Sequence, residues 1–396
     1  METFEKYQKQ LLDQAQKIYH DLPISEATQK AYLDTPRHRY VKSYREWGTK
    51  EWRKVNEDTL GEHLALLYDD RALILFGDDD KEVLSTISQP SFVLHMLDML
   101  DLKPGHKVFE LGTGSGWNAG LMGNLVGPEG GVYSLELIPE LAQTASSTLD
   151  ELGIRNVRVI EADGGDGYAI GAPYDRAIFT AGTYDLPHPF FDQVKAGGLL
   201  LIVIKNAGGG DCLFLLRKIN GHFESIESME CGFVQMKGKH QFENLEPMTL
   251  ESLPGWPRLK RKEIRTRPFW WGGRGKQGFV WRTMGIRSFL GITEPTFLAF
   301  KTESRDEQTQ EEYYFGLWSP EQESLVVAND DLLHSYGNTA ADERLVEDVE
   351  GWVRLGMPGA ASFALQVYPV EARLSTEKNQ WVIKRRESQF LWSLKS

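Results

Sequence analysis

The sequence predicts an open α/β sheet in roughly its first 240 residues and a second, smaller α+β domain after them. Two observations predict the first part. Apolar segments typical of buried strands alternate with segments of helical periodicity, and a glycine-rich turn joins one such strand to the helix after it. The third observation concerns the rest of the chain, where short apolar and aromatic runs separated by turns replace this alternation.

The composition is that of an acidic globular protein. The 396 residues include 57 Asp and Glu against 44 Lys and Arg, a formal net charge of -13. This excess disfavours non-specific binding to nucleic acid and to anionic membranes, so neither is expected as a partner. The charged N-terminus has no apolar signal segment, and no run reaches the roughly 18 apolar residues of a membrane span. We expect a cytoplasmic monomer or homodimer.

The two cysteines, Cys212 and Cys231, are too few for a disulfide framework or a cysteine-rich metal site, and no metal is expected. Residues 1 to about 33 have apolar side chains at helical spacing and predict an amphipathic helix that covers the core. It ends before Pro36, because the residue preceding a proline disfavours the α conformation. A further helix is predicted from Phe92 to Leu100.

The stretch from Val108 to Asn118, VFELGTGSGWN, predicts a buried strand, a tight turn and the start of a helix. Its glycines allow a ligand to approach the backbone closely. The spacing is E-x-G-x-G-x-G, whereas the G-x-G-x-x-G motif holds a pyrophosphate at a helix N-terminus. Glu110, at the strand end, would repel phosphate and attract a cation. S-adenosylmethionine carries both an ammonium and a sulfonium, and it suits such a site.

Later strand ends strengthen this interpretation. The strand from Gly131 ends in Glu136, whose carboxylate can accept hydrogen bonds from both ribose hydroxyls. The next ends at Asp163, before Gly164, where an adenine ring would lie, and a fourth ends at Thr180. A glycine turn that only packs a helix would explain Gly114 alone. The residues expected to bind the cofactor are Glu110, Gly112, Thr113, Gly114, Gly116, Glu136, Asp163, Gly164 and Thr180.

Three further segments complete the predicted sheet. Leu199 to Ile204, after a pair of glycines, predicts the fifth strand. Residues 212–218 and 228–236 predict a final pair, which would give seven strands with an antiparallel edge.

Four motifs, in this order, resemble the protein-L-isoaspartate O-methyltransferase family. They are TPRHRYV at 35–41, YDDRAL at 68–73, TISQP at 86–90 and the glycine stretch at 108–118, and the similarity extends over roughly residues 30–240. TISQP is the most specific of them, because folds that bind S-adenosylmethionine share much of the rest.

The resemblance implies a Rossmann-like seven-stranded methyltransferase sheet with S-adenosyl-L-methionine as cofactor. It implies an enzyme that esterifies the carboxylate of an aspartate-derived residue, normally L-isoaspartate, in a peptide or protein. Ser88 would be the catalytic hydroxyl beside that carboxylate, and Thr86, Ile87 and Gln89 would shape the substrate pocket. Transfer of a methyl group to an ionised carboxylate needs no strong base, so catalysis can rest on orientation and on excluding water.

The expected domains are a helical, substrate-side segment at 1–85, the methyltransferase domain at 86–240 and the α+β domain at 241–396. The proline-rich residues 253–257 predict a linker. The basic and aromatic segment from Arg258 to Trp271 predicts either a solvated or internally paired face, or a surface for an acidic peptide or nucleic acid.

Three functions remain open. The C-terminal domain resembles extensions of relatives from peptide natural-product pathways, in which methylation of a precursor leads to a succinimide. This favours a dedicated peptide-modifying enzyme. The complete TISQP motif favours a general repair enzyme for L-isoaspartate. The third function is an S-adenosylmethionine-binding protein that recognises a partner without methyl transfer.

Overall fold

The computed structural model describes residues 4–18, 22–77, 82–206, 210–242, 247–269, 282–301 and 313–395. The chain divides into two compact units. The first comprises Met1–Val203, Phe214–Glu227 and Phe233–Gln241, and the second comprises Ile204–Leu213, Ser228–Gly232 and Phe242–Ser396.

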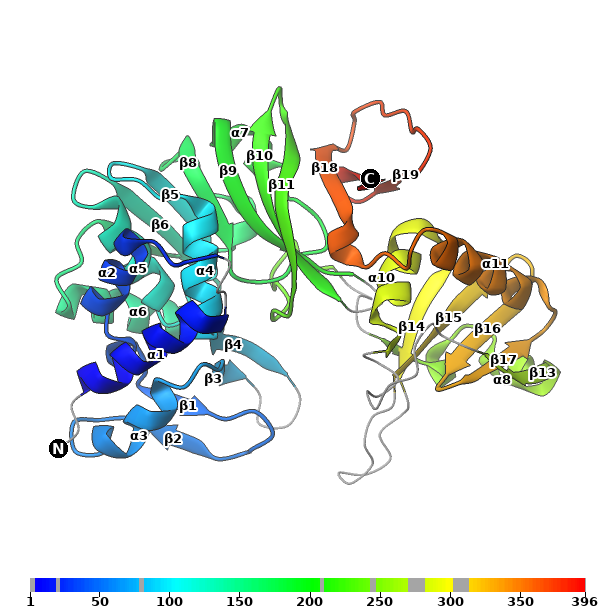
Figure 1. Ribbon diagram of the computed structural model, residues 1–396, viewed down its shortest axis with the longest axis horizontal. Coiled ribbons are helices and arrows are strands. Elements are labelled where there is room, and N and C mark those ends of the chain that lie inside the picture. Colours follow the sequence, from blue (N-terminus) through cyan, green and yellow to red (C-terminus); the bar gives the residue numbers. More distant parts are fainter. Residues whose placement is uncertain are drawn as a thin grey trace. The chain divides into compact units, whose positions relative to one another are not determined.

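The N-terminal part of the first unit contains helices and a small sheet (Figure 1). The predicted amphipathic segment is a pair of helices, and α1 buries Leu11, Leu12 and Ala15. The small sheet, in the order β2-β1-β3-β4, was not predicted, because its first two strands have only three residues each. The elements are α1 (Phe4–Ile18), α2 (Glu26–Asp34), η1 (Arg37–Tyr40), β1 (Ser43–Arg45), β2 (Trp52–Lys54), α3 (Leu60–Leu67), β3 (Leu73–Gly77) and β4 (Val83–Ile87).

The seven predicted strands are present in the order β11-β10-β9-β8-β5-β6-β7, but the sheet that contains them has ten strands, not the predicted seven. Strands β5 to β8 are parallel to their neighbours, and β9 is parallel to β8. The elements are α4 (Pro90–Leu100), β5 (Lys107–Leu111), α5 (Trp117–Val126), β6 (Gly131–Glu136), α6 (Pro139–Glu151), β7 (Val157–Glu161), η2 (Gly164–Asp166), β8 (Tyr174–Phe179), α7 (Pro189–Gln193), β9 (Val194–Ile204), β10 (Asp211–Ile219) and β11 (His222–Cys231).

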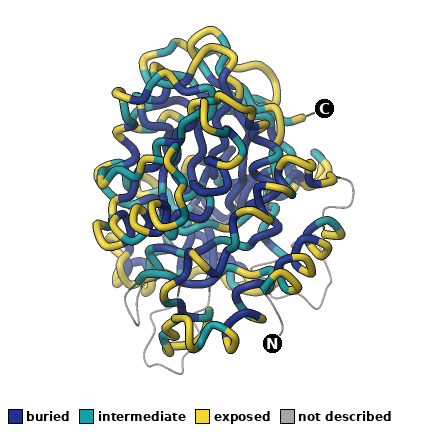
Figure 2. The backbone as a smooth tube through the Cα atoms, turned by 90° about the vertical axis from the view of Figure 1, so that its left-hand side faces the viewer, coloured by how far each residue is buried: buried dark blue, intermediate teal, exposed yellow. Residues whose placement is uncertain are grey.

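Helices cover this sheet and bury its apolar side chains. Helices α5 and α6 pack on β5, β6 and β7, and α1 and α2 pack against α4 and α5 (Figure 1). The rings of Phe109 and Phe179 lie 5.1 and 4.7 Å from that of Phe190, and all three side chains are fully buried. Figure 2 shows this distribution, with buried backbone inside and exposed stretches on outer helix faces and loops. Each such ring stabilises the fold by about 1.5–3 kcal/mol.

The second unit is α+β. Its six-stranded sheet has the order β12-β14-β15-β16-β17-β13. Helix α11 packs on β15 and β16, and it buries Leu345, Val349 and Trp352. The elements are β12 (Met248–Thr249), η3 (Leu250–Ser252), α8 (Trp256–Leu259), η4 (Lys260–Lys262), β13 (Glu263–Pro268), α10 (Met284–Thr293), β14 (Phe297–Lys301), β15 (Tyr313–Ser319), β16 (Ser324–Asn329), β17 (Leu332–Tyr336), α11 (Ala340–Arg354), η5 (Ala360–Ser362), β18 (Phe363–Pro369), β19 (Gln380–Lys384) and β20 (Ser388–Leu394).

The predicted linker at 253–257 is wrong, because this segment belongs to the core of the second unit. Leu253 and Trp256 are buried in one cluster with Phe300 and Leu325. Of the basic residues that follow, Arg265 and Arg267 both donate to the buried Asp342, and Arg258 and Lys262 pair with Glu323. The remainder of the basic and aromatic segment, residues 270 and 271, lies outside the described residues.

None of the helices in the described part of the chain has the length and hydropathy needed to cross a membrane.

Candidate active site

The turn between β5 and α5 depends on glycine. Gly112 and Gly116 have φ angles of +91° and +82°, which L side chains rarely adopt. A Cβ at Gly112 would also lie 2.6 Å from Thr180 Oγ1, too close for any side chain to fit without movement. The turn therefore exposes backbone, with no side chain in the way, at the carboxyl ends of the parallel strands.

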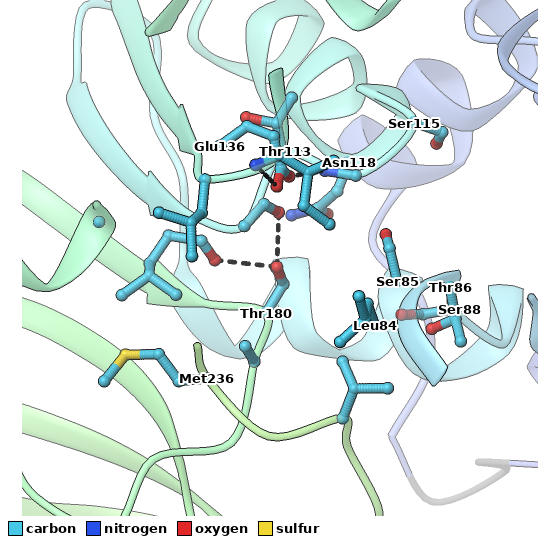
Figure 3. Close-up of a pocket in the computed structure, with 18 of the residues that line it drawn as sticks. Leu84, Ser85, Thr86, Ser88, Thr113, Ser115, Asn118, Glu136, Thr180 and Met236 are labelled. Atoms are coloured by element: carbon cyan, nitrogen blue, oxygen red, sulfur yellow. Dashed lines mark hydrogen bonds between the residues drawn. The ribbon is translucent and has the colours of Figure 1, made fainter. Parts of the chain in front are cut away.

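A cavity of about 220 Å³ lies against this turn, within the first unit (Figure 3). Five parts of the chain line it: the end of β4 with the residues before α4, helix α4 itself, the glycine turn with the start of α5, the ends of β6 to β8, and residues 234–237. Ten of the predicted site residues are in its wall: Thr86, Ile87, Ser88, Gly112, Thr113, Gly114, Glu136, Asp163, Gly164 and Thr180. Gln89, Glu110 and Gly116 are not in the wall.

Glu136 ends β6 and faces the cavity. Its carboxylate accepts hydrogen bonds from the backbone N–H groups of Gly114, at 2.8 Å, and Ile138, at 3.0 Å. Burial raises the pKa of this carboxyl above its usual range. Since a carboxylate has about four acceptor positions, two remain for the hydroxyls of a ligand.

Glu110 lies behind the cavity wall and is completely buried. Its carboxylate accepts hydrogen bonds from Asn118 Nδ2, at 2.7 Å, and from Ser134 Oγ. Burial raises the pKa of Glu110 to about 7. Asn118 lines the cavity, and its Oδ1 is buried without a hydrogen-bond partner in the described structure. Glu110 therefore does not line the cavity, but it holds the side chain of Asn118, which does.

Asp163 and Thr180 stabilise neighbouring backbone. Asp163 accepts from the N–H groups of Gly165, at 2.9 Å, and Lys239, at 2.8 Å. The hydroxyl of Thr180 lies 2.6 Å from the carbonyl oxygen of Gly112 and donates to it (Figure 3).

Ser88 and Thr86 lie on another side of the cavity, and Thr180 lies between them and Met236 in the view of Figure 3. Ser88 is half-buried, and no described group hydrogen-bonds its hydroxyl. Its carbonyl oxygen accepts from Arg37 Nη1 at 2.7 Å. The hydroxyl is thus available to a ligand on a segment whose backbone is held.

The family described as "Protein-L-isoaspartate(D-aspartate) O-methyltransferase" matches residues 6–241 of this chain. The chain belongs to this family. The resemblance drawn from the four motifs is therefore confirmed.

Relatives that carry the name protein-L-isoaspartate O-methyltransferase agree with this assignment. The relative from Ignicoccus hospitalis is 44% identical over 133 residues, which cover 34% of this chain and 63% of that protein. Protein-L-isoaspartate O-methyltransferase 1 of Archaeoglobus fulgidus is 35% identical over 237 residues, which cover 59% of this chain and 95% of that protein. A solved structure named protein-L-isoaspartate O-methyltransferase has the same fold, with a TM-score of 0.53 at 22% identity, over 91% of this chain and 96% of that one.

S-adenosyl-L-methionine is the cofactor of this methyltransferase family, as the motifs predicted. The residues present fit it. Gly112 leaves room that a Cβ would fill, and Glu136 has acceptor positions open for two ribose hydroxyls. The unpaired Oδ1 of Asn118 is an acceptor suited to an ammonium group.

Arg37 and Asp70 hold the segment around Ser88 and the start of α4, and neither was singled out from the sequence. Arg37 is fully buried, and beyond Ser88 its Nη2 donates to the carbonyls of Arg71, at 3.2 Å, and Ile87, at 3.4 Å. Its guanidinium lies 4.9 Å from the ring centroid of Trp117, a cation–π distance.

Asp70 binds the start of α4. Its carboxylate accepts from Gln89 Nε2 and from the N–H and hydroxyl of Ser91, each at 2.8 Å. Gln89 is therefore turned toward Asp70, which explains why it is not in the cavity wall. Both Arg37 and Asp70 lie within the quoted motifs. These charged residues could have been identified from the sequence, but the motifs were used only to recognise the family.

Residues 234–237 were also missed as part of the methyltransferase site. The strand predicted at 228–236 is displaced, because β11 begins at His222 and ends at Cys231. Beyond it, Gly182 N–H donates to Val234 O and Met236 N–H donates to Gly182 O, both at 2.8 Å. The segment therefore bonds to the loop after β8 and lines the cavity.

Proposed function

We propose that this methyltransferase esterifies the carboxylate of an aspartate or L-isoaspartate residue in a peptide or protein. The observation that carries the proposal is the position of Ser88. Its hydroxyl is available at the wall of the same cavity in which Glu136 and Asn118 fit the cofactor.

The reaction requires positioning more than acid–base chemistry. The bound cofactor supplies an electrophilic methyl group. Glu136 and Asn118 would hold the cofactor so that this methyl group could pass to a carboxylate oxygen of the substrate. Ser88 would donate a hydrogen bond to the other carboxylate oxygen and so orient the nucleophile, while Arg37 fixes the backbone of Ser88.

The ester makes the next step possible. Attack of the following backbone nitrogen on the ester carbonyl would expel methanol and close a succinimide, which opens to aspartate or isoaspartate. This outcome is shared by repair and by modification of a dedicated ribosomal precursor.

Two substrate classes remain. The complete TISQP motif, of which Thr86, Ile87 and Ser88 line the cavity, supports L-isoaspartate repair, as do the names of the relatives. The second unit supports a dedicated peptide less strongly, because a solved structure of that name shares the fold over 91% of this chain.

Mass spectrometry of methyl transfer tests the proposal. Two peptides that differ only in isoaspartate or aspartate at one position are incubated with the protein and S-adenosyl-L-methionine. Methylation of the isoaspartyl peptide alone supports repair. Methylation of the aspartyl peptide, or of neither generic peptide while a precursor-like peptide reacts, supports a dedicated substrate. Cofactor binding without methylation of any peptide would contradict the proposal and favour a partner-recognition role.

A further inference from the structure

Residues 233–241, which we call the strap, follow β11 and run along the cavity. The strap is held at two places. At its start, reciprocal backbone hydrogen bonds of 2.8 Å join Gly182 to Val234 and Met236. At its end, Lys239 N–H donates to Asp163 Oδ2 at 2.8 Å, and His240 Nε2 lies 3.0 Å from Asp166 Oδ1.

Lys237 lies between these two attachments and lines the cavity. Its ammonium pairs with Glu82, which immediately precedes β4, the strand that leads to Thr86 and Ser88. The pair therefore links the strap to the substrate side of the cavity. The two residues are 155 positions apart in the sequence, so this is a long-range contact.

The charged residues of the cavity wall differ in sign between the strand ends and the strap. Glu136 and Asp163 belong to the cofactor side. Among the described residues of the cavity wall, Lys237 carries the one positive charge.

The pair with Glu82 can be exchanged for another. The side chains of Lys237 and Glu82 are 24% and 45% exposed, and partly exposed ion pairs of this kind are weak. A carboxylate that arrives with a peptide can therefore replace Glu82 as the partner of Lys237.

We infer that Lys237 is a specificity-determining residue that binds an acidic side chain flanking the methylated residue of the peptide, and that Glu82 occupies its ammonium when no peptide is bound. The inference rests on the proposed carboxyl methyltransferase activity. It adds to that activity a preference for acidic substrates.

The test uses four isoaspartyl peptides, one with neutral flanks and three with a single Glu at the position before, one after or two after the isoaspartate. KM and kcat are measured for the wild-type chain and for Lys237→Met, which keeps the chain length and removes the charge. We expect at least one acidic peptide to have a KM about fivefold below that of the neutral peptide, as a partly exposed ion pair would give. In Lys237→Met the ratio of the two KM values should fall to about one.

Three variants sharpen the result. Lys237→Arg keeps the charge and should restore most of the preference. Glu82→Gln removes the internal competitor and should lower the KM for the acidic peptide further. Lys239→Met is the matched control, because Lys239 is on the same strap, is outside the cavity wall and pairs with Asp166, so its loss should leave the KM ratio unchanged.

Equal KM values for all four peptides with the wild-type chain would overturn the inference and leave the proposed function intact. The same holds if the preference survives in Lys237→Met, or if that variant loses turnover of acidic and neutral peptides alike, since Lys237 would then bind the reacting carboxylate. Absence of methylation of every peptide would overturn the proposed function and this inference with it.

Discussion

Replacing Arg37 with methionine is expected to separate the positioning of Ser88 from the stability of the fold. Arg37 is completely buried, and its strongest hydrogen bond, 2.7 Å long, holds the carbonyl oxygen of Ser88. Methionine is unbranched, has no donor and reaches about as far as Nε of arginine. The variant therefore leaves the segment around Ser88 without its main attachment while it still fills the space of the Arg37 methylenes.

Two opposing free energies set the stability of this variant. An unpaired buried carbonyl costs about 1–3 kcal/mol, and the bonds to Arg71 and Ile87, at 3.2 and 3.4 Å, add less. On the other side, burial lowers the pKa of Arg37 from its usual 12.5 to about 10. That shift corresponds to about 3 kcal/mol of cost for a buried charge, which methionine does not carry. We expect the free energy of unfolding to change by no more than about 2 kcal/mol.

The effect on catalysis should be larger. A displacement of about 1 Å in a positioning group can cost about a hundredfold in rate, so we expect kcat for the isoaspartyl peptide to fall at least about tenfold. Chemical denaturation gives the stability, methyl transfer gives kcat, and titration gives the Kd for S-adenosyl-L-methionine. Arg37→Lys, which keeps a charge but has one donor group, should be intermediate in kcat. The reasoning is refuted if kcat of the folded methionine variant stays within about twofold of wild type, or if cofactor affinity falls as much as kcat does.

Three other predictions concern the cavity itself. Ser88→Ala should lower kcat for the isoaspartyl peptide about 10- to 100-fold with little change in cofactor Kd, measured by product formation and by calorimetry; equal activity would remove Ser88 from the mechanism. Gly112→Ala should weaken cofactor binding at least about tenfold in the same titration, because its Cβ would lie 2.6 Å from Thr180 Oγ1, whereas Gly105→Ala, also at positive φ but with open space around it, should cost only backbone strain of about 1 kcal/mol. Glu110, whose pKa burial raises to about 7, holds its proton more tightly when folded, so its contribution to stability is full below about pH 4.5 and is lost as the pH rises to about 7. Between pH 5 and pH 8, the free energy of unfolding of Glu110→Gln, measured by denaturation, should therefore rise relative to that of wild type by up to about 3 kcal/mol. The same difference between the two proteins at both pH values would contradict the raised pKa of the buried Glu110 carboxyl.

The residues expected to bind the cofactor could be gathered at one place from the sequence alone, because they lie at or near the ends of consecutive strands. The turn from Gly112 to Gly116 follows directly from β5, and Glu136, Asp163 and Thr180 each stand at or just after the end of a strand. Parallel strands bring their carboxyl ends to one edge, so the sequence order of strands is enough to gather these residues.

The role of Glu110 could not be predicted in the same way. The motif places a carboxylate at the end of β5, but alternation along the strand decides which face it occupies, and neighbours from β6 decide its partners. Ser134, on the adjacent strand, and Asn118, on α5, both bind it and turn it away from the cavity. The sequence analysis expected Glu110 to contact the cofactor because of its charge, and it did not consider the direction in which the side chain leaves β5.

The part of the candidate site expected to bind substrate depends on contacts between distant parts of the chain. Arg37 reaches Ser88 across 51 positions, and Lys237 reaches Glu82 across 155. Neither pair follows from periodicity or spacing. The same is true of the core around Leu253 and Trp256, where prolines gave the segment the composition of a linker although its apolar residues are buried with Phe300.

These contacts match what the chemistry demands of each half. An ionised carboxylate is already a nucleophile, so the site needs no general base, and the carboxylates of the wall serve other purposes: Glu136 and Asp163 accept backbone hydrogen bonds. What remains for the protein is to hold the nucleophile in line with the methyl group. A hydroxyl such as that of Ser88 can do this only if its backbone does not move, and the buried charge of Arg37 provides that rigidity at a cost in desolvation. Burying such a group lowers the stability of the fold, and the same burial fixes the orientation on which methyl transfer depends.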